Sequence, residues 1–265
     1  MHVKRIITGA AGVLLLIVIV EYGADFIFTA FIAVALLIAL YEYNKIVFNK
    51  SEFKPLTAVS YPFALALIYG VYIEDMRLIF FIITFNLFIS AFISLFRYNQ
   101  DNKLDNAVIK QVFGLIYIPL FLSFAILIRG SDNGAAWVYL LLAAVFAGDT
   151  GAFYAGSYLG RNKLAPLVSP NKTIEGSAAG LISSVCAGFL IKCFFLPDIS
   201  WQKCFIICIV IGIAGQIGDL FESMLKRSSG IKDSGNILPG HGGVLDRIDA
   251  LLFAAPAAYF IKEFL

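Results

Sequence analysis

Four aspartates in the second half of the chain stand inside or at the edge of apolar stretches: Asp149, Asp219, Asp246 and Asp249. A carboxylate at depth in a membrane costs ~2.5–3.5 kcal/mol on insertion scales, so such groups usually face a partner or a water-filled cavity. Several carboxylates packed together repel one another unless cations share the site, and hard oxygen ligands suit Mg²⁺. The aspartates therefore predict a divalent-metal site. The alternative is mutual salt bridging that holds the helices together.

A basic, glycine-rich segment connects Asp219 with Asp246. Its cationic and imidazole side chains are Lys226, Arg227, Lys232 and His241. Its glycines, Gly240, Gly242 and Gly243, would let backbone N–H groups approach an anion near the start of the next helix. Cations beside carboxylates predict a phosphate-rich substrate that Mg²⁺ bridges to the protein.

A second polar segment, GRNKLAPLVSPNKTIEG, runs from Gly160 to Gly176. Lys172 offers positive charge there, and Ser169 and Thr173 flank a proline that stiffens the turn. The sequence contains no G-x-S-x-G, H-E-x-x-H or Walker A motif. It therefore favours phosphate contacts over a protein nucleophile.

Apolar helices must position these residues. The chain has 265 residues, of which 60% are hydrophobic and only 14% charged, and its mean hydropathy is +0.86. Apolar stretches of about twenty residues recur, each long enough to cross the ~30 Å hydrocarbon layer as a helix. We expect an all-α polytopic membrane helical bundle with about nine spans, at residues 6–21, 26–41, 56–73, 77–96, 108–128, 135–158, 174–196, 203–222 and 243–262.

Lysine and arginine placement sets the expected orientation. With the N-terminus in the cytoplasm, 14 of the 20 Lys and Arg residues fall on the cytoplasmic side, as the positive-inside rule requires. The C-terminus then lies outside the cytoplasm. Asp219 falls near the cytoplasmic end of the eighth span, Asp246 and Asp249 at the start of the ninth, and Asp149 in the cytoplasmic half of the sixth. We expect these carboxylates to converge.

The two halves of the chain differ. Before residue 130, acids occur only at links and span ends, so residues 1–130 are expected to form a scaffold or a dimer surface. Residues 131–265 are expected to form the catalytic bundle. Small residues at GxxxG-like spacing, among them Gly176, Gly180, Gly215 and Gly218, predict close helix packing in this second half.

The segment SMLKRSSGIKDSGNILPGHGGVLDRID, from Ser223 to Asp249, resembles the signature of the phosphatidate cytidylyltransferases, also called CDP-diacylglycerol synthases. The segment GDTGAFYAGSYLGRNKLAPLVSPNKTIEG, from Gly148 to Gly176, is similar to a second region of that family. The resemblance implies that CTP and phosphatidic acid give CDP-diacylglycerol and pyrophosphate, with Mg²⁺ required. It also implies a homodimer in the cytoplasmic (inner) membrane, with an active site that faces the cytoplasm and a lateral opening to lipid. No nucleic-acid partner is expected.

Residue roles follow as hypotheses. Asp219 and Asp246 are the first choices for metal ligands, followed by Asp249 and Asp149. The catalytic set comprises Asp219, Asp246, Lys226 and Arg227. The substrate-binding set comprises Ser169, Lys172, Thr173, Ser223, Lys232, His241, Gly242 and Gly243.

Other functions remain as alternatives. Intramembrane acids also mark ion-coupled transporters, which would have acids spread through the membrane depth and broken helices in paired halves; the sequence has neither. A related CTP-using lipid enzyme, such as a polyprenol kinase, and a non-enzymatic lipid-binding scaffold are the other candidates.

Overall fold

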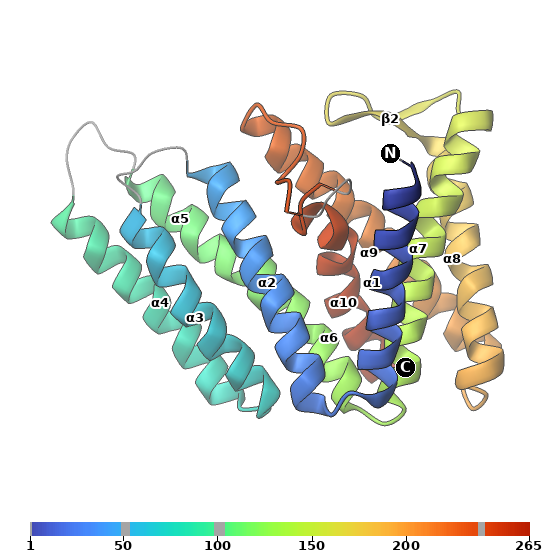
Figure 1. Cartoon of the computed structure of the whole chain (residues 1–265), viewed down its shortest axis with the longest axis horizontal. Helices are drawn as coiled ribbons and strands as arrows, with labels where there is room; N and C mark the ends of the chain where they lie inside the picture. The colour runs from blue at the N-terminus through green and yellow to red at the C-terminus, as the bar shows by residue number, and fades with distance from the viewer. Residues whose placement is uncertain (1, 49–53, 98–103, 238–241) are drawn as a thin grey trace. The chain divides into compact units, whose positions relative to one another are not determined.

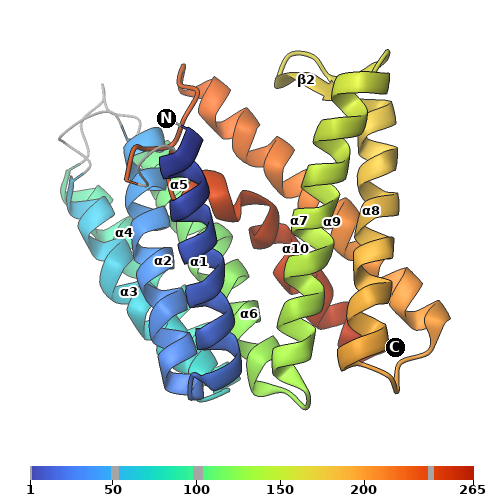
Figure 2. The ribbon, with the colours of Figure 1, turned by 45° about the vertical axis from the view of Figure 1, so that its right-hand side comes forward.

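The computed structural model describes residues 2–48, 54–97, 104–237 and 242–265, and Figures 1 and 2 show it as a ribbon. Each expected span coincides with a helical stretch. The helices are α1 (His2–Tyr22), α2 (Asp25–Val47), α3 (Lys54–Tyr72), α4 (Met76–Phe96), α5 (Leu104–Leu115), α6 (Phe121–Gly130), α7 (Gly134–Leu159), α8 (Ile174–Phe195), α9 (Trp201–Ser228) and α10 (Leu245–Phe264).

A π-helical turn, η2 (Ile116–Leu120), joins α5 to α6, so the fifth expected span is one interrupted helix. Pro119 lies inside this turn. Proline has no N–H group and collides with the preceding turn of a regular helix, and a wider π turn accommodates it. The backbone N–H of Phe121 donates to the carbonyl of Ile116, five residues back.

Seven stretches of the described chain are long and apolar enough to cross a membrane: residues 25–47, 54–72, 76–96, 106–130, 134–159, 174–195 and 201–228. A shorter apolar helix covers Gly12–Tyr22. Apolar side chains such as Phe80, Phe88 and Leu95 lie exposed on the protein surface, as lipid-facing residues do. The protein is therefore an all-α, polytopic integral membrane protein.

Two short strands add to the predicted helices. β1 (Lys163–Ala165) and β2 (Ser169–Thr173) form an antiparallel hairpin, with Lys163 opposite Thr173 and Ala165 opposite Ser169. This hairpin lies in the polar segment between α7 and α8, which the sequence indicated only as a loop.

The chain divides into two compact units. The first contains Met1–Leu127 and Asp233–Asp246, and the second contains Ile128–Lys232 and Arg247–Leu265. The expected domain boundary at residue 130 lies close to the first division. The return of residues 233–246 to the N-terminal helices was not part of that expectation.

The first unit packs around Tyr43 of α2. Its hydroxyl donates to the carbonyl of Lys110 at 2.8 Å, and its ring contacts Tyr117 edge-on, with 6.2 Å between centroids. A side chain at Gly114 would collide with the Tyr43 ring. A buried polar pair also joins α2 to α3, since Asn44 Nδ2 donates to Ser60 Oγ at 3.2 Å.

In the second unit α7 and α8 run side by side (Figures 1 and 2). Glycines face one another along this contact, and a Cβ at Gly180 would lie 2.9 Å from the carbonyl oxygen of Gly148. Gly218 of α9 packs as closely against the backbone of Asp249 and Ala250 in α10. The predicted close packing of the small residues is confirmed, and it places polar residues of α7, α9 and α10 near one another.

Candidate active site

Carboxylates from three helices of the second unit come together. Asp149 of α7 interacts electrostatically with Asp219 of α9. Asp249 of α10 interacts with both and also with Glu222 of α9. We call Asp149, Asp219, Glu222 and Asp249 the carboxylate cluster. Since neighbouring like charges repel, the cluster attracts cations.

Lys172 supplies one of these cations. Its ammonium group forms an ion pair with Asp219, and each side chain is just under a third exposed, at 28% and 29%. Lys172 also interacts electrostatically with Asp149. The hairpin thus brings one positive charge to two members of the carboxylate cluster.

The hairpin is held at both ends of its sequence. Thr173 caps α8 by accepting a hydrogen bond from the N–H of Gly176 at 3.1 Å. In the first turn of α8, the Glu175 carboxylate accepts hydrogen bonds from the backbone N–H groups of Arg161 and Asn162 at 3.1 and 3.2 Å, and from Asn162 Nδ2 at 2.8 Å. These bonds fix the position from which Lys172 reaches Asp219.

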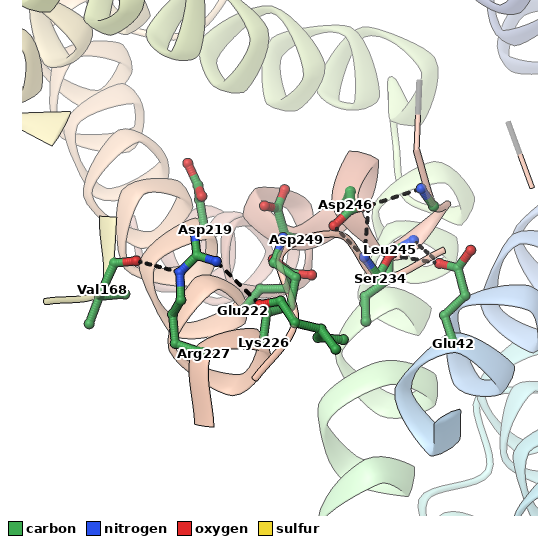
Figure 3. A network of polar contacts seen from close by, with 12 residues as sticks. Glu42, Val168, Asp219, Glu222, Lys226, Arg227, Ser234, Leu245, Asp246 and Asp249 are labelled. Atoms are coloured by element: carbon green, nitrogen blue, oxygen red, sulfur yellow. Dashed lines mark hydrogen bonds and ion pairs between the residues drawn. The ribbon is translucent and has the colours of Figure 1, made fainter. Parts of the chain in front are cut away.

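The last turns of α9 carry two basic residues of the signature segment, Lys226 and Arg227. Lys226 forms an ion pair with Glu222, four residues earlier and fully buried. Arg227 donates to the backbone carbonyls of Val168, at 3.4 Å, and Ile231, at 3.2 Å. Figure 3 shows Arg227 reaching Val168, with Asp219, Glu222 and Asp249 nearby. Arg227 therefore ties the hairpin to α9.

In the first unit, Asp246 organises the loop before α10. Its carboxylate accepts hydrogen bonds from the backbone N–H of Ser234, at 3.2 and 3.1 Å, and of Gly243, at 2.9 Å. Gly242 has φ +84°, and a Cβ there would lie 3.0 Å from the Asp246 carboxylate. Glycine is required here because an L side chain rarely adopts a positive φ.

Glu42 of α2 contacts this loop, and the sequence reasoning did not identify it. It lies just past the predicted end of the second span. It is 1% exposed, and its carboxylate accepts from Ser234 Oγ at 3.1 Å, Val244 N at 3.1 Å and Leu245 N at 2.8 Å. A glutamate that ends an apolar run between two tyrosines was the only signal for it.

The donor set suits a hard divalent cation such as Mg²⁺, since the carboxylate cluster offers oxygen ligands from three helices. Within the described ranges, no three His, Cys, Asp or Glu side chains are arranged so that they could hold an ion as they stand. In this arrangement Asp219 is paired with Lys172.

The sequence profile described as the cytidylyltransferase family matches residues 3–265, nearly the whole chain. The chain belongs to the cytidylyltransferase family. Among curated relatives, a phosphatidate cytidylyltransferase of Bacillus subtilis is 40% identical over 147 residues, which is 55% of each chain. One from Mycobacterium tuberculosis is 36% identical over 154 residues, 58% of this chain and 47% of the relative. One from Thermotoga maritima is 37% identical over 185 residues, 68% of each.

The chain thus spans about half the length of the first of these relatives. The matches confirm the resemblance that the two sequence segments indicated. The member of the cytidylyltransferase family described here is a helical membrane protein.

For this family member, the structure brings together only part of the predicted site. Asp149, Asp219, Asp249 and Lys172 converge in the second unit, and Ser169 and Thr173 lie in the same hairpin. Ser223 is half-buried on α9, and Lys232 is exposed beyond it. Asp246, Gly242 and Gly243 belong to the first unit, so the predicted pocket shared by Asp219 and Asp246 stays a prediction. His241 lies outside the described residues.

Proposed function

We propose that this protein is a phosphatidate cytidylyltransferase, which transfers CMP from CTP to phosphatidic acid and releases pyrophosphate. The observation that carries the proposal is the carboxylate cluster with Lys172 paired to Asp219, in a chain of the cytidylyltransferase family. The names of its curated relatives support the choice of lipid substrate.

The reaction needs charge neutralisation more than a protein nucleophile. A phosphate oxygen of phosphatidic acid, already ionised near neutral pH, forms a bond to the α-phosphorus of CTP. The bond from that phosphorus to the bridging oxygen breaks, and pyrophosphate leaves with the electron pair. No general base is required. The obstacle is the mutual repulsion of two polyanions, which the fixed cations reduce and which a carboxylate-bound metal would reduce further.

The residues divide accordingly. Asp219 and Asp246, with Asp249 and Asp149, would hold Mg²⁺, which would supply positive charge to the phosphates and to the leaving pyrophosphate. Lys226, Arg227, Lys232 and His241 bind phosphate oxygens. Lys172 is held close to Asp219 before substrate arrives, and with Ser169, Thr173 and Ser223 it contacts substrate. Gly242 and Gly243 let the backbone approach an anion.

The chain crosses the inner membrane nine times, with its N-terminus in the cytoplasm, and works as a homodimer. Within the described ranges, seven helical stretches are long and apolar enough to span a membrane and a shorter apolar helix covers Gly12–Tyr22. These helices support a polytopic topology, and the distribution of Lys and Arg supports the cytoplasmic N-terminus. After replacement of the four native cysteines, single cysteines at Ser229 and Asp132 test it. An impermeant maleimide should label position 229 from the cytoplasmic side and position 132 from the opposite side. Labelling of both from one side would overturn the topology. Chemical crosslinking in membranes tests the dimer.

The decisive experiment incubates the purified full chain with labelled CTP, Mg²⁺ and a panel of lipids. CDP-lipid formed from phosphatidic acid, with pyrophosphate release, supports the proposal. Lipid phosphorylation without CMP transfer would instead indicate a polyprenol kinase, and absence of turnover would favour transport or lipid binding. If the Asp246→Ala variant retained normal turnover in Mg²⁺, the proposal that Asp246 is a metal ligand would be wrong.

A further inference from the structure

Glu42 connects the N-terminal helices with the signature segment. Its carboxylate lies in α2, yet its three hydrogen-bond donors are about two hundred residues later in the chain: Ser234 Oγ, Val244 N and Leu245 N. Figure 3 shows the Glu42 side chain pointing to Ser234 and Leu245. All of these residues belong to the first unit.

The bonds explain how a carboxylate can be almost fully buried there. A buried charge is tolerated only where hydrogen bonds or ion pairs compensate for lost solvation. The backbone N–H groups at the start of a helix have no partner within the helix, and they carry a partial positive charge. Val244 and Leu245 supply two such groups at the start of α10. Glu42 thus acts as a capping residue provided by a different helix.

Glu42 and Asp246 hold the loop before α10 from two sides. Ser234 joins them, because its hydroxyl donates to Glu42 and its backbone N–H donates to Asp246. A side chain at Gly235 or Gly243 would collide with the Glu42 carboxylate. The close approach of Glu42 therefore requires glycine at both positions, and any shift of Glu42 is passed directly to the loop.

We propose that Glu42 is a positioning residue for nucleotide binding. It fixes Ser234 and the start of α10, and through them the Asp246 carboxylate and the Gly242–Gly243 backbone. This role rests on the proposed function, in which those groups face metal and phosphate. Glu42 itself contacts neither. A substitution should weaken CTP binding more than it lowers turnover at saturating CTP.

Glu42→Gln is the test variant because it keeps the shape of the side chain and removes only its charge and one acceptor. The amide NH₂ then faces a backbone N–H or the Ser234 hydroxyl, so at least one donor loses its partner. We expect the KM for CTP to rise about tenfold or more, with a smaller change in kcat. Ser234→Ala removes one of the three bonds and should raise the KM by a few-fold.

The matched control is Asn44→Ala. Asn44 lies on the same helix and is buried, but the hydrogen bond that its side chain donates goes to Ser60 of α3. It lowers stability without touching the loop, so the KM for CTP should remain unchanged. A KM that rises equally in Asn44→Ala and Glu42→Gln would show a merely structural role and overturn the proposal.

Hydrogen exchange of the full chain in lipid nanodiscs provides a readout that does not depend on activity. Glu42→Gln should speed exchange at residues 234–237 and 242–246, whereas Asn44→Ala should not. Unchanged exchange there, or an unchanged KM for CTP in Glu42→Gln when the wild type makes CDP-lipid, would overturn the role of Glu42. A wild type with no transferase activity but with the exchange effect would instead refute the proposed function and leave the loop-holding part of the inference standing.

Discussion

Replacement of Lys172 by methionine should alter metal and nucleotide binding in opposite directions. Methionine keeps the length of the side chain but removes its charge. In the structure Lys172 neutralises Asp219, so it competes with any cation for that carboxylate. If Lys172 also binds a phosphate of CTP, Lys172→Met should lower the Mg²⁺ concentration needed for half-maximal effect and raise the KM for CTP.

The exposure of the pair sets the expected size of both effects. The two side chains are 28% and 29% exposed, so solvent screens the pair and its loss is worth about 1 kcal/mol or less. Removing that competition should tighten Mg²⁺ binding by up to about fivefold. A hydrogen bond to a charged group contributes about 1.5–3 kcal/mol, so the KM for CTP should rise about 10- to 150-fold. Folding stability should change little.

Two assays measure these effects. CDP-lipid formation at varied CTP gives the KM, and thermal unfolding at varied Mg²⁺ gives metal binding, because a ligand that binds the folded state raises its stability by RT ln(1 + [L]/Kd). Lys163→Met is the control, since Lys163 is exposed on the same hairpin. It should leave both quantities as in the wild type. A Lys172→Met protein with unaltered Mg²⁺ and CTP dependence would refute the reasoning.

Three further predictions concern the second unit. Glu175→Gln removes the charged acceptor that holds the hairpin, so trypsin should cleave the hairpin faster than in the wild type, and an unchanged rate would contradict the role. Gly176→Ala places a Cβ 2.7 Å from the carbonyl oxygen of Ala152, which should cost about 1–3 kcal/mol and lower the midpoint of thermal unfolding. Asp219→Asn and Asp249→Asn should each reduce turnover at least about 100-fold. If both side chains bind one metal, the loss of turnover in the double variant should be far smaller than the product of the two single losses. A loss equal to that product would show that the two aspartates act independently.

The helices and part of the site could be predicted from the sequence because their signals are local. A run of about twenty apolar residues predicts a membrane-spanning helix without reference to the rest of the chain, and each expected span coincides with a helical stretch. The glycines of α7, α8 and α9 report close approach of neighbouring backbones. With the aspartates placed at similar depth, the convergence of Asp149, Asp219 and Asp249 followed.

The features that the sequence did not reveal depend on contacts between distant segments. Hydropathy ends a predicted span where polar residues begin, so the second span was expected to stop at residue 41. The helix α2 continues to Val47 because Tyr43 and Ile46 still pack inside the first unit, and Glu42 is buried with them. The hairpin of residues 163–173 is too short and too polar to show the alternation of apolar and polar residues that predicts a strand. It is held instead by the hydrogen bonds that the Glu175 carboxylate accepts from Arg161 and Asn162.

The division of the signature segment changes the meaning of the N-terminal half. Residues 223–232 and 247–249 belong to the second unit, where Glu222, Lys226 and Asp249 lie, whereas residues 233–246 belong to the first. One continuous motif therefore serves two structural environments. Glu42 of α2 is a buried acceptor for residues 233–246 of the signature segment. The N-terminal helices therefore contribute to the position of this segment. Their packing determines where a loop of the proposed nucleotide site is held, and substitution of Glu42 in α2 should therefore affect CTP binding.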